Sequence, residues 1–223
     1  MADNGRGRKK RVAVLISGRG SNMTALIEAS KAQAFPAEIA LVLANRPDAG
    51  GLAHARTAAV ATAVVDHVAH GKDRAAFERA MQAELETNRI DLVCLAGFMR
   101  LLTPWFVGQW TGRMLNIHPA LLPAFKGLDT HARAIAAGVK IHGASVHFVV
   151  PEMDSGPIIV QGAVPVRDDD TAETLAARVL AIEHRIYPLA LGLVAAGRVR
   201  IVEGRCLIDG AHRSHETLIV PEN

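Results

Sequence analysis

Short apolar runs that alternate with helical segments constrain the fold of this chain more than any other feature. The runs lie at residues 12–16, 39–43, 63–65, 90–95 and 114–117. The first of them, VAVLI, is apolar without interruption, as expected of a parallel strand that is buried on both faces. Between the runs, apolar residues such as Phe77, Met81 and Leu85 recur at helical spacing. This alternation predicts an α/β fold with a mostly parallel central sheet flanked by helices.

The second half of the chain shows a more mixed pattern, which begins after Pro123. We predict strands at 145–150 and 158–160, a long helix from 171 to about 193, and a short hairpin near 198–208. No internal repeat or low-complexity linker divides the chain. We therefore expect residues 11–223 to form a single domain with a parallel first half and a mixed second half.

The basic excess of the chain is confined to its start. Residues 1–11 hold five of the 25 basic residues and one of the 22 acidic residues, a net of +4, which leaves 20 basic and 21 acidic residues elsewhere, a net of −1. We expect the Gly-rich stretch 1–10 to be a disordered tail. Such a tail could contact RNA or lipid, but we favour a solubilising extension. The remaining chain has no basic surface for a nucleic-acid partner.

Cysteine content and hydropathy indicate where the protein works. The two cysteines do not suggest a disulfide framework, and Cys94 falls inside an apolar strand pattern. The N-terminus has no apolar signal core, and no apolar window is long enough to cross a bilayer. We therefore expect a cytoplasmic protein without a membrane partner.

The turn after the first predicted strand, residues 18–23, is rich in small residues. Gly18 and Gly20 match the first glycines of a dinucleotide-binding motif, but Met23 replaces the third, and no acidic residue clearly ends the second strand. Backbone N–H groups at a helix N-terminus favour an anion, and Ser21 and Asn22 add side-chain donors. We predict a phosphate monoester site here, with an ordinary βα turn as the alternative.

A second candidate site lies at the end of the fifth predicted strand. Asn116 and His118 are two residues apart, so they face the same side of an extended strand. An amide can donate to a developing oxyanion, and an imidazole titrates near neutral pH. The alternative is a strand end with a structural histidine. Asp154, in a predicted loop, could orient and charge the imidazole, although spacing alone does not predict this pairing.

The other histidines do not show the spacing of a metal site. His142 and His147 would face opposite sides of a single strand, because five residues separate them. His184 has no histidine three or four residues away on its predicted helix. We predict no metal.

The chain carries a series of motifs in a definite order: residues 14–18 with 20–22, 95–100, 115–119 with 121–123, 143–149, 154–157 and 183–188. Together they resemble the phosphoribosylglycinamide formyltransferase family of folate-dependent enzymes. The resemblance covers about residues 11–209, and the stretch 127–131 points to this branch of the wider formyltransferases. It implies a Rossmann-like formyltransferase fold. It also implies transfer of a formyl group from 10-formyltetrahydrofolate, a cosubstrate, to the amine of glycinamide ribonucleotide in purine (IMP) synthesis.

The resemblance also implies where each substrate binds. The ribonucleotide phosphate is expected on Gly20, Ser21 and Asn22, and its ribose hydroxyls on Glu183. Leu180 stands where the family is expected to have a polar Gln. The folate is expected to contact the following residues: Arg74, Met99, Arg100, Leu101, Leu102, Asn116, Val150, Pro151, Glu152, Met153 and Asp154. A cis peptide bond is expected before Pro123.

The implied chemistry uses three residues and no metal. The substrate amine attacks the formyl carbon, and Asn116 and a protonated His118 stabilise the tetrahedral oxyanion. His118 then gives a proton to the departing folate nitrogen. Asp154 favours the protonated imidazole and helps remove the proton of the amine.

Several alternatives stay open. A formyltetrahydrofolate hydrolase would use water as the acceptor, but typically carries an N-terminal regulatory domain, and about ten residues precede the first predicted strand. A formyltransferase could also act on another amine. From other classes, we consider a non-catalytic phospho-ligand or folate-binding protein and a dinucleotide oxidoreductase. We expect small-molecule partners and a monomer or homodimer.

Overall fold

The computed structural model describes residues 8–210 and 219–220 of the chain. Its strands are β1 (Lys10–Ile16), β2 (Ala37–Ala44), β3 (Thr62–Val64), β4 (Leu92–Leu95), β5 (Met114–His118), β6 (Ile141–Phe148), β7 (Ile158–Pro165), β8 (Val199–Val202) and β9 (Arg205–Ile208). Its helices are α1 (Ser21–Ser30), α2 (Gly51–Thr57), α3 (Arg74–Thr87), α4 (Pro104–Gln109), α5 (Thr130–Ala136) and α6 (Ala172–Ala195). No helix of the described part is long and apolar enough to span a membrane.

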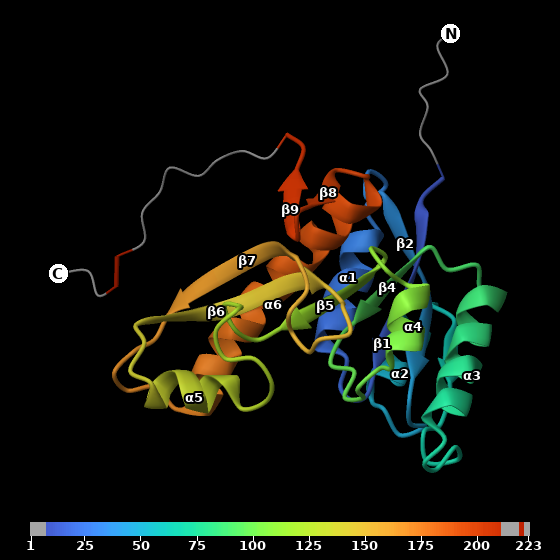
Figure 1. The fold of residues 1–223 in the computed structure, drawn as a ribbon, viewed down its shortest axis with the longest axis horizontal. Coiled ribbons are helices and arrows are strands. Elements are labelled where there is room, and N and C mark those ends of the chain that lie inside the picture. Colours follow the sequence, from blue (N-terminus) through green and yellow to red (C-terminus); the bar gives the residue numbers. More distant parts are fainter. Residues whose placement is uncertain (1–7, 211–218, 221–223) are drawn as a thin grey trace, which may run out of the picture.

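Seven strands form one sheet in the order β3-β2-β1-β4-β5-β6-β7 (Figure 1). Strands β1 to β5 are parallel to one another. Strand β6 is antiparallel to β5, and β7 is antiparallel to β6. The predicted α/β class, with a mostly parallel sheet and a more mixed second half, is confirmed.

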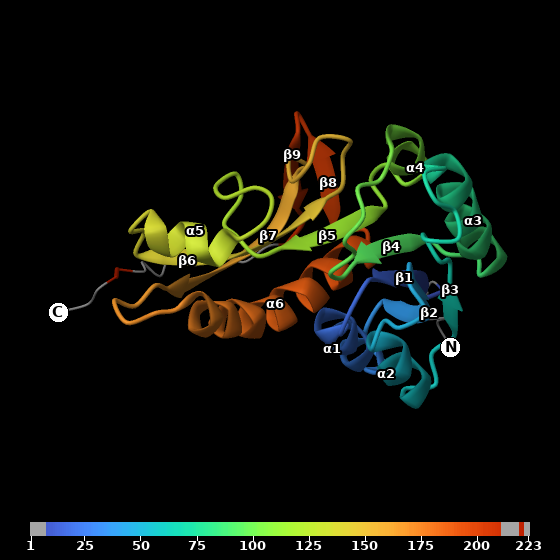
Figure 2. The same cartoon turned by 90° about the horizontal axis from the view of Figure 1, so that it is seen from below.

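Helices cover both faces of the sheet (Figure 2). Val12, Val14 and Ile16 of β1 pack in the cluster that includes buried residues of α1, α2 and α6. Ala13 and Leu15 point to the other cluster, which includes residues of α3 and α4. All five side chains are fully buried. Strand β1 is therefore apolar without interruption because it is buried on both faces, as the sequence predicted. Its side chains enter the two clusters alternately.

The strand order places a switch point at β1. The chain runs from β1 to β2 and β3 on one side, and then returns to β4 and β5 on the other. Connections that leave in opposite directions open a crevice at the carboxyl ends of the strands, where ligands bind in sheets of this type. Three segments lie at these carboxyl ends: the turn before α1, the segment after β4 and the end of β5.

Several predicted strand boundaries were wrong. Strand β6 ends at Phe148 rather than at residue 150, and β7 extends to Pro165 rather than ending at residue 160. Strand β6 begins at Ile141 rather than at residue 145, and it includes Gly143, which masks the strand pattern in the sequence. A Cβ atom at position 143 would lie 2.0 Å from the carbonyl oxygen of Gly162, so the close pairing with β7 requires glycine.

The predicted tail, residues 1–10, overlaps the described structure. Lys10 is the first residue of β1, where its N–H donates to the carbonyl of Pro36. Arg8 forms an ion pair with Asp91 at 3.0 Å. Backbone pairing with the neighbouring strand therefore extends order to a residue that the composition assigned to the tail. Residues 1–7 of the tail lie outside the described part, as do 211–218 and 221–223 of the predicted domain.

Candidate active site

Strand β5 carries Asn116 and His118 between β4 and β6. Asn116 is paired with His147 of β6, and His118 with Ser145. The Nδ2 atom of Asn116 lies 3.2 Å from Nε2 of His147. The side chain of Asp154 lies close to His118 and to His147, so the two residues of β5 share one side of the sheet, as period two requires.

Asp154 reaches His118 because the loop between β6 and β7 folds back toward β5. Its Oδ2 atom lies 3.4 Å from Nδ1 of His118, and its side chain is 11% exposed. The same oxygen accepts a hydrogen bond from the N–H of Gly127 at 2.9 Å. Asp154 has a left-handed backbone, φ 50°, a conformation that Asp tolerates better than most residues. The carboxylate is thus held by a second loop as well as its own.

The imidazole of His118 has an acceptor at each ring nitrogen. Nδ1 faces Asp154, and Nε2 lies 3.0 Å from the carbonyl oxygen of Phe125. A carboxylate oxygen and a carbonyl oxygen therefore flank the ring, one at each nitrogen. The ring is 5% exposed. Donation to a ligand therefore requires that one of these two contacts be exchanged.

His147 belongs to this cluster, although sequence analysis assigned it no role in the site beyond its place in the 143–149 motif. Its Nδ1 lies 2.8 Å from the carbonyl oxygen of Phe148, which favours the tautomer protonated at Nδ1. Nε2 then accepts from the Asn116 amide and fixes the direction of that amide. Burial lowers the pKa of His147, so this neutral form is favoured. Only the pairing of β5 with β6 reveals the contact, and no local pattern signals it.

His142 lies apart from His147 and packs in a different aromatic group. Its ring meets those of Phe125 and His131 edge to face, with centroids 5.7 and 5.4 Å away. Within the described residues, neither nitrogen of His142 has a hydrogen-bond partner. Burial, reinforced by the nearby His131, lowers the pKa of His142 to about 4. Among the described residues, no group of three or more His, Cys, Asp or Glu is placed to hold a metal.

The predicted phosphate turn lies at the start of α1. Gly20 is the N-cap residue with φ 75°, and it provides no side-chain cap. A Cβ atom there would lie 3.1 Å from Cα of Gly51, so glycine also permits the close approach of α2. Because no side chain caps the helix, the N–H groups of its first turn remain available to an anion.

Asn22 and Glu183 meet although 161 residues separate them. The Asn22 amide donates to Oε2 of Glu183 at 2.6 Å. This contact exists because α1 packs against α6, whose Tyr187 donates its hydroxyl to the carbonyl of Leu95 at 3.0 Å. Glu183 is 7% exposed, and burial raises its pKa, while the bond from Asn22 opposes that shift. The structure thus brings Glu183 beside the turn formed by Gly20, Ser21 and Asn22.

The predicted folate residues follow three adjacent strands. The segment 99–102 comes after β4, Asn116 lies on β5, and 150–154 comes after β6. The N–H of Met99 donates to the Ser17 hydroxyl at 2.8 Å, which holds this segment at the end of β1. Arg74 at the start of α3 donates to the carbonyl of Leu101.

Several large apolar side chains are exposed on these segments. Met99, Leu101 and Met153 are 64%, 70% and 56% exposed. Large apolar side chains of this exposure often mark a site that a ligand covers. The remaining predicted members, Arg100, Leu102, Val150, Pro151 and Glu152, are exposed or half-buried in the same segments. The expected cis bond between Leu122 and Pro123 is present.

Comparison with known proteins identifies relatives. Residues 10–191 match the model of a family described as formyl transferase. The trifunctional purine biosynthetic protein adenosine-3 of Bos taurus is 50% identical over 88% of this chain but only 19% of its own length. The chain therefore spans about a fifth of curated relatives of that kind.

Other relatives match this chain over nearly their full length. The phosphoribosylglycinamide formyltransferase of Escherichia coli is 44% identical over 89% of this chain and 93% of its own. The solved structure of glycinamide ribonucleotide transformylase 1 from Symbiobacterium toebii superposes with a TM-score of 0.87 at 45% identity. That alignment covers 92% of this chain and 95% of the other.

Proposed function

This chain belongs to the formyl transferase family, and we propose that it transfers the formyl group of 10-formyltetrahydrofolate to the amine of glycinamide ribonucleotide. The reaction is a step of de novo purine synthesis, and the folate is a cosubstrate that each turnover consumes. The observation that carries the proposal is the cluster of Asn116, His118 and Asp154 at the end of β5. Like this cluster, the start of α1 lies at the carboxyl ends of the strands, and no side chain caps it, which suits a phosphate.

In this proposal the ribonucleotide lies along the start of α1. The N–H groups and side chains of Gly20, Ser21 and Asn22 bind its phosphate, where the helix dipole favours negative charge. Glu183 accepts hydrogen bonds from the ribose hydroxyls. The contact between Asn22 and Glu183 fixes the distance between these two parts of the site. The amine of the glycinamide then extends toward β5.

The folate covers the apolar surface formed by 99–102 and 150–154. Met99 and Leu101 pack against its ring system, and main-chain groups of both segments read its polar edge. In this proposal Arg74 and Arg100 bind the carboxylates of its tail. The formyl group then lies beside Asn116 and His118.

The chemistry forms one C–N bond and breaks another. The acceptor amine attacks the formyl carbon, and the oxygen becomes an oxyanion that receives hydrogen bonds from Asn116 and His118. His147 holds the amide of Asn116 in the donating direction. The bond between the formyl carbon and the folate nitrogen then breaks, and that nitrogen takes the proton of His118. Asp154 takes up the proton lost by the amine, directly or through water.

The contact of His118 with Phe125 has a role in this series of reaction steps. With Nδ1 facing Asp154 and Nε2 on the carbonyl of Phe125, a protonated His118 directs no N–H at the oxyanion. We propose that the imidazole exchanges the carbonyl of Phe125 for the substrate oxygen. The exchange replaces a neutral acceptor by a charged one, which is the stronger hydrogen bond.

We further propose that a single domain carries the whole site, as a monomer or homodimer in the cytoplasm, without nucleic-acid or membrane partners. The continuous sheet supports the first point, since β1 to β7 hold both halves of the site. The net charge of −1 outside residues 1–11 supports the lack of a nucleic-acid partner, and the two free cysteines support the cytoplasm.

The proposal is tested by measuring the turnover of 10-formyltetrahydrofolate with and without glycinamide ribonucleotide. The absorbance of the folate product reports the turnover. We expect product only when the ribonucleotide is present. Product without it would favour a hydrolase, and no product would favour another amine acceptor. Asn116→Ala serves as the inactive control.

A further inference from the structure

The turn between β1 and α1 contains one charged side chain, Arg19, which the proposed function has not used. The residues from Ser17 to Met23 are otherwise neutral. Arg19 is exposed, and within the described residues its guanidinium forms no hydrogen bond or ion pair. Arg46 and Arg178, by contrast, pair with Asp48 and Asp170. An exposed guanidinium in this turn that pairs with no described residue is available to a ligand.

The proposed phosphate creates a charge imbalance that Arg19 can correct. A phosphate monoester carries about −1.5 to −2 charges near pH 7, whereas the N–H groups of the turn are neutral and a helix start contributes about +0.5. Glu183 adds a buried carboxylate beside Asn22. The site therefore holds more negative than positive charge unless a cation faces the phosphate.

Helix α6 offers no polar group at the corresponding place. Leu180 precedes Glu183 by three residues, so the two side chains lie on one face of α6, one turn apart. Glu183 reaches Asn22 at the start of α1. Leu180 presents an aliphatic side chain where the family resemblance implies a Gln. A polar contact to the phosphate from α6 is thus absent at this position, which leaves Arg19 as the charged group of the turn.

We propose that Arg19 binds the phosphate of the ribonucleotide and determines the preference of this enzyme for a phosphorylated acceptor. The inference rests on the proposed function and adds a contact to the same site. A guanidinium presents two parallel N–H groups to phosphate oxygens, which adds geometric selectivity to the charge. The neutral donors of Gly20, Ser21 and Asn22 then orient the phosphate, and Arg19 neutralises it.

The test compares glycinamide ribonucleotide with its unphosphorylated riboside in wild type and Arg19→Ala. Loss of a charge-assisted contact corresponds to about a 10- to 100-fold rise in KM for the ribonucleotide. We expect kcat to be unchanged, because the contact is the same in ground state and transition state. The Kd of the riboside, measured by calorimetry, and the KM of the folate should not change, so the preference for the phosphorylated acceptor collapses.

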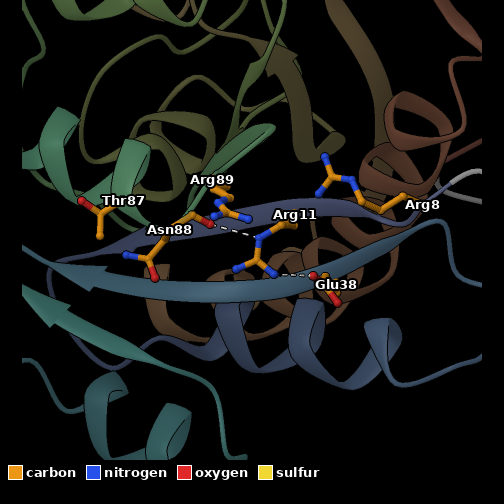
Figure 3. A pocket seen from close by; sticks show the side chains of 6 residues that line it. All are labelled: Arg8, Arg11, Glu38, Thr87, Asn88 and Arg89. Atoms are coloured by element: carbon orange, nitrogen blue, oxygen red, sulfur yellow. Dashed lines mark hydrogen bonds and ion pairs between the residues drawn. The ribbon is translucent and has the colours of Figure 1, made fainter.

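Two matched variants separate a direct contact from an effect of net charge. Arg89→Ala removes the same charge near the amino end of β4. Arg89 lies there with Arg8 and Arg11 (Figure 3). It should leave the KM for the ribonucleotide unchanged. Arg19→Lys keeps the charge but loses the paired N–H groups, so its KM should lie between those of wild type and Arg19→Ala.

The outcomes distinguish this inference from the proposed function. An unchanged KM in Arg19→Ala, or an equal loss for ribonucleotide and riboside, would overturn the inference while wild-type turnover still supported the function. Equal effects of Arg89→Ala and Arg19→Ala would also overturn it, because the cause would then be net charge. If the wild type fails to formylate the ribonucleotide, the proposed function itself falls.

Discussion

His142→Phe should remove one defined component of the acid sensitivity of the fold. His142 is 1% exposed, and its ring packs against Phe125 and His131. Burial, reinforced by His131, lowers its pKa from 6.5 to about 4. As pH falls, the unfolded chain therefore binds this proton before the folded chain does. The stabilising contribution of a neutral His142 is complete above about pH 6.5 and is lost as pH falls toward about 4.

The size of the effect follows from the two pKa values. With 6.5 in the unfolded chain and about 4 in the folded protein, linkage gives a loss of roughly 2 kcal/mol at about pH 5 relative to neutral pH. The full shift corresponds to roughly 3 kcal/mol below about pH 4. A phenylalanine at this position cannot take up a proton, so the variant should lack this loss.

Urea unfolding of both proteins at several pH values between about 7.5 and 4.5 measures the effect. Any packing cost of the larger ring shifts the variant by a constant amount, and the other buried histidines titrate in both proteins. The free energy of unfolding of wild type minus that of the variant should therefore fall by about 2 kcal/mol between neutral pH and about pH 5. A difference that stays constant across this range would refute the reasoning.

Three further predictions concern the site and its support. Asn116→Ala and His118→Ala should each lower kcat by at least about 100-fold while keeping a cooperative urea transition, since both side chains act on the oxyanion in the proposed mechanism; near-wild-type kcat would contradict their role. Asn22→Asp should raise the KM for glycinamide ribonucleotide by at least about tenfold, because it adds a charge beside Glu183 and the phosphate; an unchanged KM would count against the phosphate site. Ser145→Ala should destabilise the fold by about 1–3 kcal/mol in urea unfolding, because its fully buried hydroxyl bonds Ala120, Leu122 and Gln161; a loss well below 1 kcal/mol would show that other groups replace these bonds.

Local pattern was sufficient for the elements of the parallel half. The apolar runs of β1 and β2 and the helical spacing of α3 are properties of consecutive residues, and they depend only on which face each side chain presents. The same period places Asn116 and His118 on one side of β5. The beginning of β6 was missed because Gly143 has no side chain to show a pattern, and its place depends on the carbonyl of Gly162.

The sequence by itself determined the fold class, the two candidate turns at the ends of β1 and β5, and the residue types of the candidate site. Only the tertiary structure decided which distant residues meet them: Asp154 beside His118, His147 beside Asn116, and Glu183 beside Asn22. The reason is physical. Side-chain period is set by the geometry of the local backbone, whereas these contacts are set by the pairing of β5 with β6, the path of the loop after β6 and the packing of α1 on α6.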